Sequence, residues 1–205
     1  TPADALDAVE ESFRRIARGA VENPPRSRVL LEDGVFAVMP CADTELGYAG
    51  LKSYAWLAPR GTPFVVVLFS LEDARVEAVL EAETLSELRT AAASGVAVKY
   101  LAREGASTLG VIGCGRQGAA HVDALRVALP SLERVVVYCR NAERLTEFCR
   151  AHDCEPAESH QDVGGLDVVV TATTSHDPVV RGEWLREGAL VCGVGANDPA
   201  ARELD

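Results

Sequence analysis

Residues 108 to 141 contain the pattern that most constrains how this chain can fold. A short apolar stretch, Thr108-Leu109-Gly110-Val111-Ile112, leads into the loop Gly113-Cys114-Gly115-Arg116-Gln117-Gly118. An alanine-rich segment of helical character follows, and then a second apolar stretch, Val135-Val136-Val137-Tyr138. Strand, glycine loop, helix and strand in this order are typical of the dinucleotide-binding half of a Rossmann fold. The pattern therefore predicts an α/β domain with a dinucleotide site.

Each glycine of the loop has a physical role in such a site. Gly113 allows the tight turn out of the strand, Gly115 lets the backbone approach a diphosphate, and Gly118 lets the helix pack closely on the sheet. The free amide groups at the helix start, with the helix dipole, favour the negative charge of a phosphate. We expect the cofactor to lie on this loop, beside Arg116 and Gln117.

From residue 106 onward, predicted strands alternate with helices, which indicates a doubly wound parallel sheet. The expected strands are residues 109–112, 135–138, a weak one near Cys154, 168–171 and 190–194. These are about five strands, whereas a complete sheet of this type carries about six. Because the sequence stops at Asp205, we expect either a longer natural protein or a partner subunit that covers the strand at 190–194.

The preceding residues follow a different pattern. Thr1 and Pro2 suit a helix start, and apolar residues recur at helical spacing from Leu6 to Ile16. Strands of an antiparallel sheet are expected at residues 28–31, 35–39, 50–54 and 64–69, and a long helix at 84–104. We predict an N-terminal α+β domain over residues 1–105, including the linking helix, and a Rossmann domain over residues 106–205.

Charge and composition exclude several classes of partner. The net charge of -11 argues against nucleic acid or an anionic membrane, because either would require a basic face. No apolar run is long enough to span a bilayer, and no signal-peptide pattern opens the sequence, so we expect a cytoplasmic protein. The six cysteines and four histidines lack metal-ligand spacing, so no metal is expected. We expect reduced cysteines that fill small apolar gaps, and only Cys114, in the phosphate loop, lies where oxidation would matter.

Several short stretches outside the glycine loop are specific in combination. They are Pro24-Pro25-Arg26, Val38-Met39-Pro40, Gly50-Leu51-Lys52, Leu88-Arg89-Thr90-Ala91-Ala92-Ala93-Ser94, Val170-Thr171-Ala172-Thr173-Thr174-Ser175, Val194-Gly195-Ala196-Asn197 and Arg202-Glu203-Leu204. With them the sequence resembles the ornithine cyclodeaminase and mu-crystallin family over essentially the whole chain. The resemblance implies a substrate and dimerisation domain, then a Rossmann domain, then a segment that returns to the first domain. That returning segment is absent from the sequence, which also leads us to expect a homodimer formed through the N-terminal sheet.

The resemblance implies roles for three cations of the first domain. Lys52, Arg26 and Arg89 match positions around the carboxylate of an amino or imino acid. A guanidinium donates two parallel hydrogen bonds to a carboxylate, so Arg26 and Arg89 are expected to hold the substrate. Lys52 would protonate the substrate nitrogen or polarise its carboxylate. Without the resemblance, each would be interpreted as a solvated surface charge.

Further residues are expected at the cofactor. The resemblance implies contacts from Thr90, at the same helix start as Arg89, and from Ala172, Thr173, Thr174, Val194 and Gly195. His176 could approach the nicotinamide, although a loop histidine is more often solvated. Tyr138-Cys139-Arg140-Asn141 ends the second strand without the acidic residue that binds a ribose 2′-hydroxyl. An arginine at this position, Arg140, suits a 2′-phosphate and therefore predicts a preference for NADP(H) over NAD(H). The alternative interpretation is that Arg140 is an exposed side chain without a role in cofactor binding.

Three positions depart from the cyclodeaminase pattern. Asn197, a candidate catalytic residue, stands where ornithine cyclodeaminases carry an essential aspartate, and an amide cannot act as a carboxylate base. Ala37 replaces a glutamate, and Gly61-Thr62-Pro63-Phe64 would make a different pocket wall. We therefore expect reduction of a small cyclic imino acid by NADPH, or an amino acid dehydrogenase. The alternatives are a true ornithine cyclodeaminase and a non-catalytic NADPH-binding protein.

Overall fold

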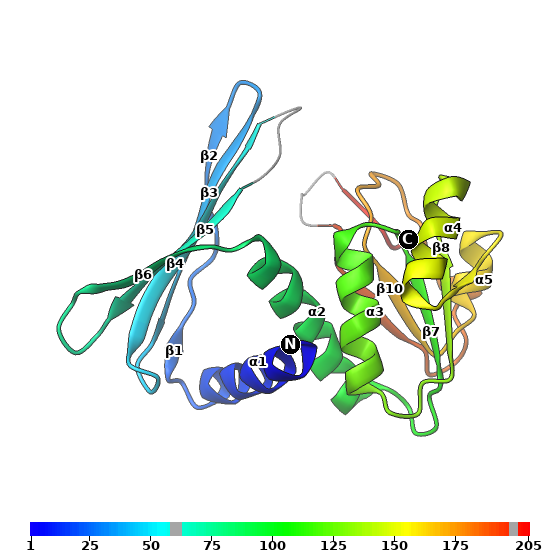
Figure 1. Cartoon of the computed structure of the whole chain (residues 1–205), viewed down its shortest axis with the longest axis horizontal. Helices are drawn as coiled ribbons and strands as arrows, with labels where there is room; N and C mark the ends of the chain where they lie inside the picture. The colour runs from blue at the N-terminus through cyan, green and yellow to red at the C-terminus, as the bar shows by residue number, and fades with distance from the viewer. Residues whose placement is uncertain (58–62, 197–200) are drawn as a thin grey trace. The chain divides into compact units, whose positions relative to one another are not determined.

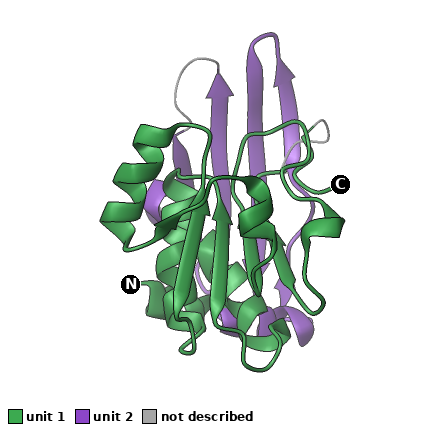
Figure 2. Cartoon of the chain, turned by 90° about the vertical axis from the view of Figure 1, so that its right-hand side faces the viewer, with its two compact units in different colours: residues 1–9, 87–205 green, residues 10–86 purple. Residues whose placement is uncertain are grey.

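The computed structural model describes residues 1–57, 63–196 and 201–205. The chain divides into two compact units, which Figure 2 distinguishes. Residues 1–9 and 87–205 form the nucleotide unit, and residues 10–86 form the sheet unit. The division falls inside the linking helix α2 (Glu83–Leu101), whereas the sequence-based boundary lay after it. Most of α2 belongs to the nucleotide unit because side chains such as Ala91 and Val98 are buried in its core.

The sheet unit is an antiparallel sheet with the strand order β1-β3-β4-β5-β6, and β2 pairs with β3 (Figure 1). Its strands are β1 (Val21–Glu22), β2 (Ser27–Leu31), β3 (Gly34–Asp43), β4 (Tyr48–Leu57), β5 (Phe64–Ser70) and β6 (Val76–Glu81). The structure confirms the four predicted strands as β2 to β5. The sequence interpretation missed β1, which has two residues, and β6, whose glutamates and exposed apolar residues form no clear alternation.

Helix α1 (Pro2–Ala17) begins as predicted, with Thr1 and Asp4 hydrogen-bonded to each other at the first turn. Leu6 packs against Ala92 and Val96 of α2 within the nucleotide unit. At the other end of α1, the Arg15 side chain donates to the Asp43 carboxylate of β3 at 2.6 Å.

The nucleotide unit is built on a parallel sheet with the order β11-β10-β7-β8-β9, which confirms the predicted α/β fold. Its elements are β7 (Thr108–Ile112), α3 (Arg116–Ala128), β8 (Arg134–Tyr138), α4 (Ala142–His152), β9 (Glu155–Pro156), α5 (His160–Gly164), β10 (Val168–Thr171), the 3-10 turn η1 (Gly182–Trp184) and β11 (Leu190–Gly193). The chain leaves β7 toward β8 and β9, and later returns to the other side of β7 with β10. This reversal creates a topological switch point, and ligands bind there at the carboxyl ends of the strands.

Both faces of this parallel sheet are buried. Along β10, Val168 and Val170 face one apolar cluster, and Val169 faces another. The helix side chains Val122 and Leu125 of α3 complete the first cluster, and Val163 of α5 belongs to the second. Strands covered on two faces read as continuous apolar runs, which is why the sequence revealed them clearly.

Candidate functional site

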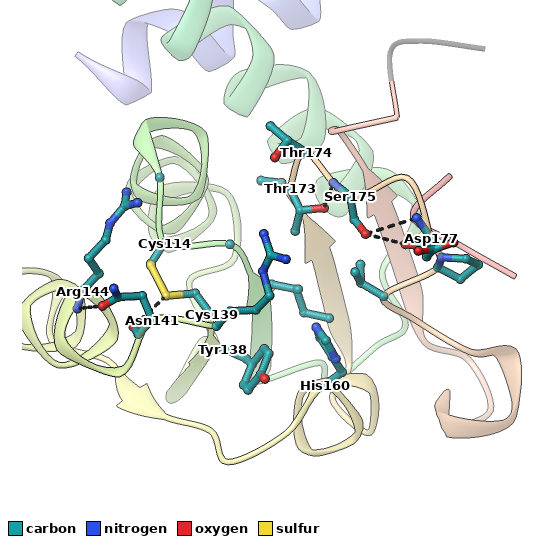
Figure 3. Close-up of a pocket in the computed structure, with 17 residues that line it drawn as sticks. Cys114, Tyr138, Cys139, Asn141, Arg144, His160, Thr173, Thr174, Ser175 and Asp177 are labelled. Atoms are coloured by element: carbon teal, nitrogen blue, oxygen red, sulfur yellow. Dashed lines mark hydrogen bonds between the residues drawn. A yellow bond between two sulfur atoms is a disulfide. The ribbon is translucent and has the colours of Figure 1, made fainter. Parts of the chain in front are cut away.

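A groove of about 650 Å³ opens at the carboxyl ends of β7, β8 and β10. Its lining is Ile112, Gly113, Cys114, Gly115, Tyr138, Cys139, Arg140, Asn141, Arg144, His160, Ala172, Thr173, Thr174, Ser175, Asp177, Pro178 and Val179. Figure 3 shows Cys114 and Cys139 on one side, Thr173 to Asp177 on the opposite side, and Tyr138 and His160 at one end. The groove therefore lies at the switch point, where the fold places a nucleotide.

The glycine loop has the backbone geometry that a dinucleotide site requires. Gly113 adopts φ 116°, which an L side chain rarely adopts, and a Cβ there would lie 2.4 Å from the Ala172 carbonyl oxygen. A Cβ on Gly118 would lie 2.1 Å from the Gly113 carbonyl oxygen, so only glycine lets α3 approach the loop this closely. At Gly115, by contrast, a Cβ would meet no atom within 4 Å. The loop is thus packed behind and open in front, as the approach of a diphosphate demands.

The start of α3 can receive an anion. Its N-cap is Gly115, whose lack of a side chain leaves no side-chain cap hydrogen bond, and no acidic residue lies in the first turn. The first amide groups of a helix carry partial positive charge and lack partners inside the helix. The space in front of Gly115 therefore faces groups that favour a phosphate.

Glu203 organises the opposite wall of the groove. Its side chain is 1% exposed. One carboxylate oxygen accepts hydrogen bonds from the amide and hydroxyl of Thr173, both at 2.7 Å. The other accepts from the Thr171 hydroxyl at 2.8 Å and the Gly195 amide at 2.6 Å. Sequence reasoning assigned no role to Glu203, whose only signal was its place in the matching stretch Arg202-Glu203-Leu204.

An aromatic wall closes one end of the groove. The rings of Tyr138 and His160 are tilted against each other with centroids 4.4 Å apart. His160 opens α5 behind a capping box formed by Ser159 and Asp162. Burial and the nearby Arg140 guanidinium lower the pKa of His160, which favours the neutral form of the imidazole. This wall was missed from the sequence because His160 meets Tyr138 only through the pairing of neighbouring strands.

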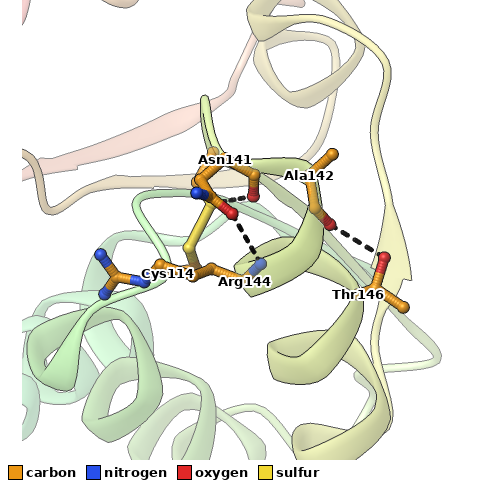
Figure 4. The surroundings of a disulfide bond; sticks show 6 residues. Cys114, Asn141, Ala142, Arg144 and Thr146 are labelled. Atoms are coloured by element: carbon orange, nitrogen blue, oxygen red, sulfur yellow. Dashed lines mark hydrogen bonds between the residues drawn. A yellow bond between two sulfur atoms is a disulfide. The ribbon is translucent and has the colours of Figure 1, made fainter.

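The structure corrects the expectation that all six cysteines are reduced. Cys114 and Cys139 are joined by a disulfide, with Cα atoms 5.8 Å apart (Figure 4). They are 25 positions apart in sequence, but β7 and β8 are paired neighbours, so the residues that follow them lie side by side. The other cysteines, which are Cys41, Cys149, Cys154 and Cys192, carry free thiols.

In the sheet unit, Arg26 and Lys52 are connected through the side chains of Tyr54 and Phe64. Arg26 Nη1 donates to the Tyr54 hydroxyl at 3.0 Å. The Tyr54 and Phe64 rings lie 5.2 Å apart, and Lys52 Nζ lies 4.5 Å from the centre of the Phe64 ring. Lys52 also donates to the Ser86 hydroxyl at 2.9 Å. The Nε of Arg26 is buried and has no hydrogen-bond partner within residues 1–57, 63–196 and 201–205.

The groove brings together part of the predicted cofactor set. Gly113, Gly115, Arg140, Ala172, Thr173 and Thr174 line it, and Gly118 supports it from behind. Thr90, Arg116, Gln117, Val194 and Gly195 do not line it, and neither does His176. Arg116 instead pairs with Glu87 at 2.7 Å, and the Gln117 carbonyl oxygen lies 2.7 Å from His121 Nδ1.

Other predicted positions lie in α2, in β3 or outside the described residues. Arg89 and Thr90 lie in the second turn of α2, which corrects their placement at a helix start, because the helix already begins at Glu83. Ala37 is fully buried in β3. Asn197, and Gly61 and Thr62 of the predicted pocket wall, lie outside the described residues.

The residues that the structure describes contain neither a cluster of metal ligands nor a membrane-spanning helix. Within residues 1–57, 63–196 and 201–205, no three His, Cys, Asp or Glu side chains gather closely enough to hold a metal ion. No helix in that part of the chain combines the length and apolar character needed to cross a membrane.

Comparison with known proteins agrees with this geometry. Residues 2–205 match the model of the ornithine cyclodeaminase/mu-crystallin family. The chain is 36% identical to the alanine dehydrogenase of Archaeoglobus fulgidus, an alignment that covers 98% of the chain and 65% of that protein. The chain thus spans about two thirds of the length of such relatives.

Two solved structures are similar over 100% of the chain. An archaeal alanine dehydrogenase dimer with bound NAD has a TM-score of 0.92 and 33% identity, over 66% of its own chain. The Δ1-pyrroline-2-carboxylate reductase of Thermococcus litoralis, in complex with NADH and L-proline, has a TM-score of 0.91 and 27% identity, over 68% of its chain. With its parallel sheet, glycine loop and matching sequence, the chain belongs to the ornithine cyclodeaminase/mu-crystallin family.

Proposed function

We propose that this chain binds NADP(H) in the groove of the nucleotide unit and reduces the C=N bond of a small imino acid. The observation that carries the proposal is the open space in front of Gly115, which faces the uncapped start of α3. Gly113 and Gly118 exclude side chains behind that space. A dinucleotide diphosphate has the shape and charge that fit it.

The preference for NADP(H) rests on the residues after β8. The related structures carry NAD or NADH, whereas this chain has Cys139 and Arg140 where an acidic residue would bind a ribose 2′-hydroxyl. The Arg140 side chain is exposed at the rim of the groove, and Arg144 adds a second cation to the lining. A guanidinium forms charge-assisted hydrogen bonds with a phosphate, so both side chains favour the phosphorylated cofactor.

The substrate assignment rests on Arg26 and Lys52 of the sheet unit and on Arg89 of the nucleotide unit. Arg26 has one guanidinium nitrogen held by Tyr54, while its buried Nε has no hydrogen-bond partner among the residues that the structure describes. A buried donor without a partner costs free energy, and a substrate carboxylate would satisfy it. We assign Arg26 and Arg89 to carboxylate binding, together with Asn197 as a further candidate of the catalytic site.

The chain's own residues position and protonate the substrate. When bound, the reduced nicotinamide supplies a hydride to the carbon of the C=N bond. Lys52 supplies the proton at the substrate nitrogen. Its ammonium group is held in place by the Ser86 hydroxyl and the Phe64 ring.

A second candidate is an amino acid dehydrogenase, which would act on an oxo acid and ammonia. The 36% identity to an alanine dehydrogenase favours it. The same cations and the same hydride transfer serve both reactions, since an imino acid is reduced in each: it is the substrate of the reductase and an intermediate of the dehydrogenase. Both reactions require nicotinamide cofactors, which cells keep in their interior, so the proposal includes a cytoplasmic location.

The proposal also includes a homodimer formed through the sheet unit. Side chains alternate between the faces of a sheet, and the register sets Pro40, Leu51, Val67 and Val79 in one row, on the face opposite Lys52. Val29, Phe36, Val38, Ala42, Ala49, Ala55, Val65 and Phe69 belong to the same face. We call this set the apolar face. Because an exposed apolar surface of this kind needs cover, a second copy is its simplest partner.

Cofactor titration and turnover test the proposal together. NADPH should bind about tenfold more tightly than NADH, since one charge-assisted hydrogen bond is worth about 1.5 to 3 kcal/mol. Arg140→Ala should remove the difference, while Arg150→Ala, which deletes an exposed arginine of α4 outside the groove lining, should keep it. Equal affinities of the unmodified chain for both cofactors would contradict the NADP(H) assignment.

Turnover is followed as loss of NADPH absorbance with Δ1-pyrroline-2-carboxylate, Δ1-piperideine-2-carboxylate, or pyruvate plus ammonia. Oxidation with a cyclic imino acid supports the reductase, and oxidation with pyruvate and ammonia supports the second candidate. Arg26→Ala should lose most turnover and keep its NADPH affinity, because the arginine only positions substrate. Tight binding of NADPH without turnover of any of these compounds would overturn the assignment as an enzyme.

A further inference from the structure

Cys114 and Cys139 line the groove where the phosphate loop lies beside the end of β8. Cys114 lies between Gly113 and Gly115 of the phosphate loop. Cys139 directly follows β8, the place at which a Rossmann domain binds the adenosine ribose. Both residues line the groove, and Figure 3 shows the bridge between them on its wall.

We propose that Cys114 and Cys139 form a reversible thiol–disulfide pair, whose bridge hinders binding of the dinucleotide at the ribose end of the groove and whose reduction favours binding. This inference rests on the proposed binding of a nicotinamide dinucleotide. It adds a modification site to that function, and the reactant that it requires is a low-molecular-weight disulfide.

The backbone geometry of this pair suits formation and cleavage of a bridge. The Cα atoms lie 5.8 Å apart, inside the range in which two cysteines bond without backbone movement. After reduction, the Cys139 thiol has an acceptor at hand, because its sulfur lies 3.3 Å from the Asn141 carbonyl oxygen. Each state of Cys139 therefore has a partner.

The bridge and the cofactor compete for the same space. A dinucleotide whose diphosphate lies at Gly115 must extend toward Arg140. The disulfide joins Cys114 and Cys139, which are the sequence neighbours of these two residues. The bond also ties the phosphate loop to the end of β8, so neither can shift to admit the ribose. Reduction replaces the bridge by two thiols that rotate independently about their χ1 angles.

The remaining cysteines are less suited to this chemistry. Burial raises the pKa of Cys149 and of Cys192, and it raises the pKa of Cys154 to about 11. The thiolate is the form that attacks a disulfide, so these thiols react slowly at neutral pH. Cys41 is exposed but belongs to the sheet unit and is not one of the groove-lining residues.

The reaction is a two-step thiol–disulfide exchange. One thiolate attacks a sulfur of the small disulfide RSSR, forms a mixed disulfide and releases one RSH after protonation. The second cysteine displaces the other RS group, which also leaves as RSH. Two electrons pass from the protein thiols to RSSR, and both thiol protons end on the released RSH. In an intracellular protein, disulfides of this kind are transient and respond to redox state.

The test compares both redox states of the whole chain. Protein reduced with dithiothreitol and freed of it is divided, and one half is treated with glutathione disulfide. Intact mass should show loss of two hydrogen atoms, and peptide mapping should join Cys114 to Cys139. The Kd for NADPH should rise by about tenfold in the bridged form, and dithiothreitol should restore it. Saturating NADPH should slow formation of the bridge, because competition between the two events is reciprocal.

Three variants make the test specific. Cys114→Ala and Cys139→Ala should show the same Kd before and after oxidant, each compared with its own reduced form. Cys41→Ser, which removes an exposed thiol outside the groove lining, should respond like the unmodified chain. A bridged form with unchanged Kd, or a mixed disulfide that never resolves to the bridge, overturns the inference alone. If the reduced chain binds neither NADPH nor NADH, the proposed function fails and this inference fails with it.

Discussion

Asp167 shows how one buried carboxylate holds the nucleotide unit together. It precedes β10 and is 2% exposed. It accepts hydrogen bonds from the Ser107 amide at 3.0 Å and from the Thr108 amide and hydroxyl at 3.1 and 2.7 Å. Arg103 and Arg186 each donate to it at 2.9 Å. Burial alone would raise the pKa of Asp167, but these donors outweigh it and hold the pKa well below its usual range.

We expect Asp167→Asn to lower the free energy of unfolding by about 2 to 3 kcal/mol, because the two arginines and two amides lose their shared anion. Chemical denaturation at pH 7 measures this. Glu133→Gln, which neutralises an exposed carboxylate just before β8, should change stability by less than about 0.5 kcal/mol. A loss no larger than that of Glu133→Gln would refute the role of Asp167.

The lowered pKa of Asp167 also sets the sign of a pH dependence. Since the folded pKa lies below the unfolded value, the unfolded chain binds more protons in acid, and stability rises with pH. The contribution is complete above about pH 4, the ordinary aspartate value, and is lost as pH falls toward the folded pKa. The difference in stability between the unmodified chain and Asp167→Asn should therefore shrink on acidification. A difference that stays constant down to about pH 2 would contradict this.

At the scale of the element, the two glycines at the start of α3 have different roles. Gly118 allows close packing of the helix on the loop, and Gly115 leaves space for a ligand. Gly118→Ala sets a methyl group against the Gly113 carbonyl oxygen and should cost about 1 to 3 kcal/mol of stability, as overpacking does. Gly115→Ala places its methyl group in open space, on a backbone with φ -101° that alanine accepts. Its stability should change by less than about 0.5 kcal/mol.

Nucleotide affinity should respond in the opposite order to stability. The Gly115→Ala methyl group occupies the space assigned to the diphosphate, so NADPH affinity should fall by about tenfold or more in a variant that is fully folded. Thermal unfolding and NADPH titration on both variants provide the two measurements. A Gly115→Ala variant that binds NADPH normally would show that the diphosphate does not approach this loop.

At the scale of the whole molecule, the apolar face of the sheet unit predicts the oligomeric state. Val79 on β6 is 66% exposed and lies on the apolar face, while its neighbour Leu80 is 44% exposed and lies on the face of Lys52. Val79→Glu should shift the chain from dimer to monomer in a light-scattering dilution series, because it buries a charge at the contact. Leu80→Glu is the matched control and should remain dimeric. A monodisperse monomer of the unmodified chain at every concentration would exclude the homodimer.

Local sequence patterns predicted most of the architecture. The continuous valine runs of β8 and β10 mark strands buried on two faces, and the order of strands and helices after residue 106 implies a parallel sheet. The glycine spacing predicted the nucleotide site, because only glycine accepts φ 116° at position 113 and the short contact distance at position 118. These features could be predicted since each depends on residues close together in the sequence. The short β1 and the edge strand β6 lacked such a signal.

Tertiary structure alone decided which distant side chains meet in the groove. Cys139 reaches Cys114 because β8 pairs with β7, and His160 reaches Tyr138 because the chain returns beside β8 through β9. Glu203 contacts Thr171 and Thr173 across a separation of about thirty residues. The α/β fold and the phosphate loop could be predicted from the sequence, because they follow from periodicity and backbone stereochemistry. The bridge, the aromatic wall and the buried carboxylate depend on strand order, which brings residues together that no local pattern connects.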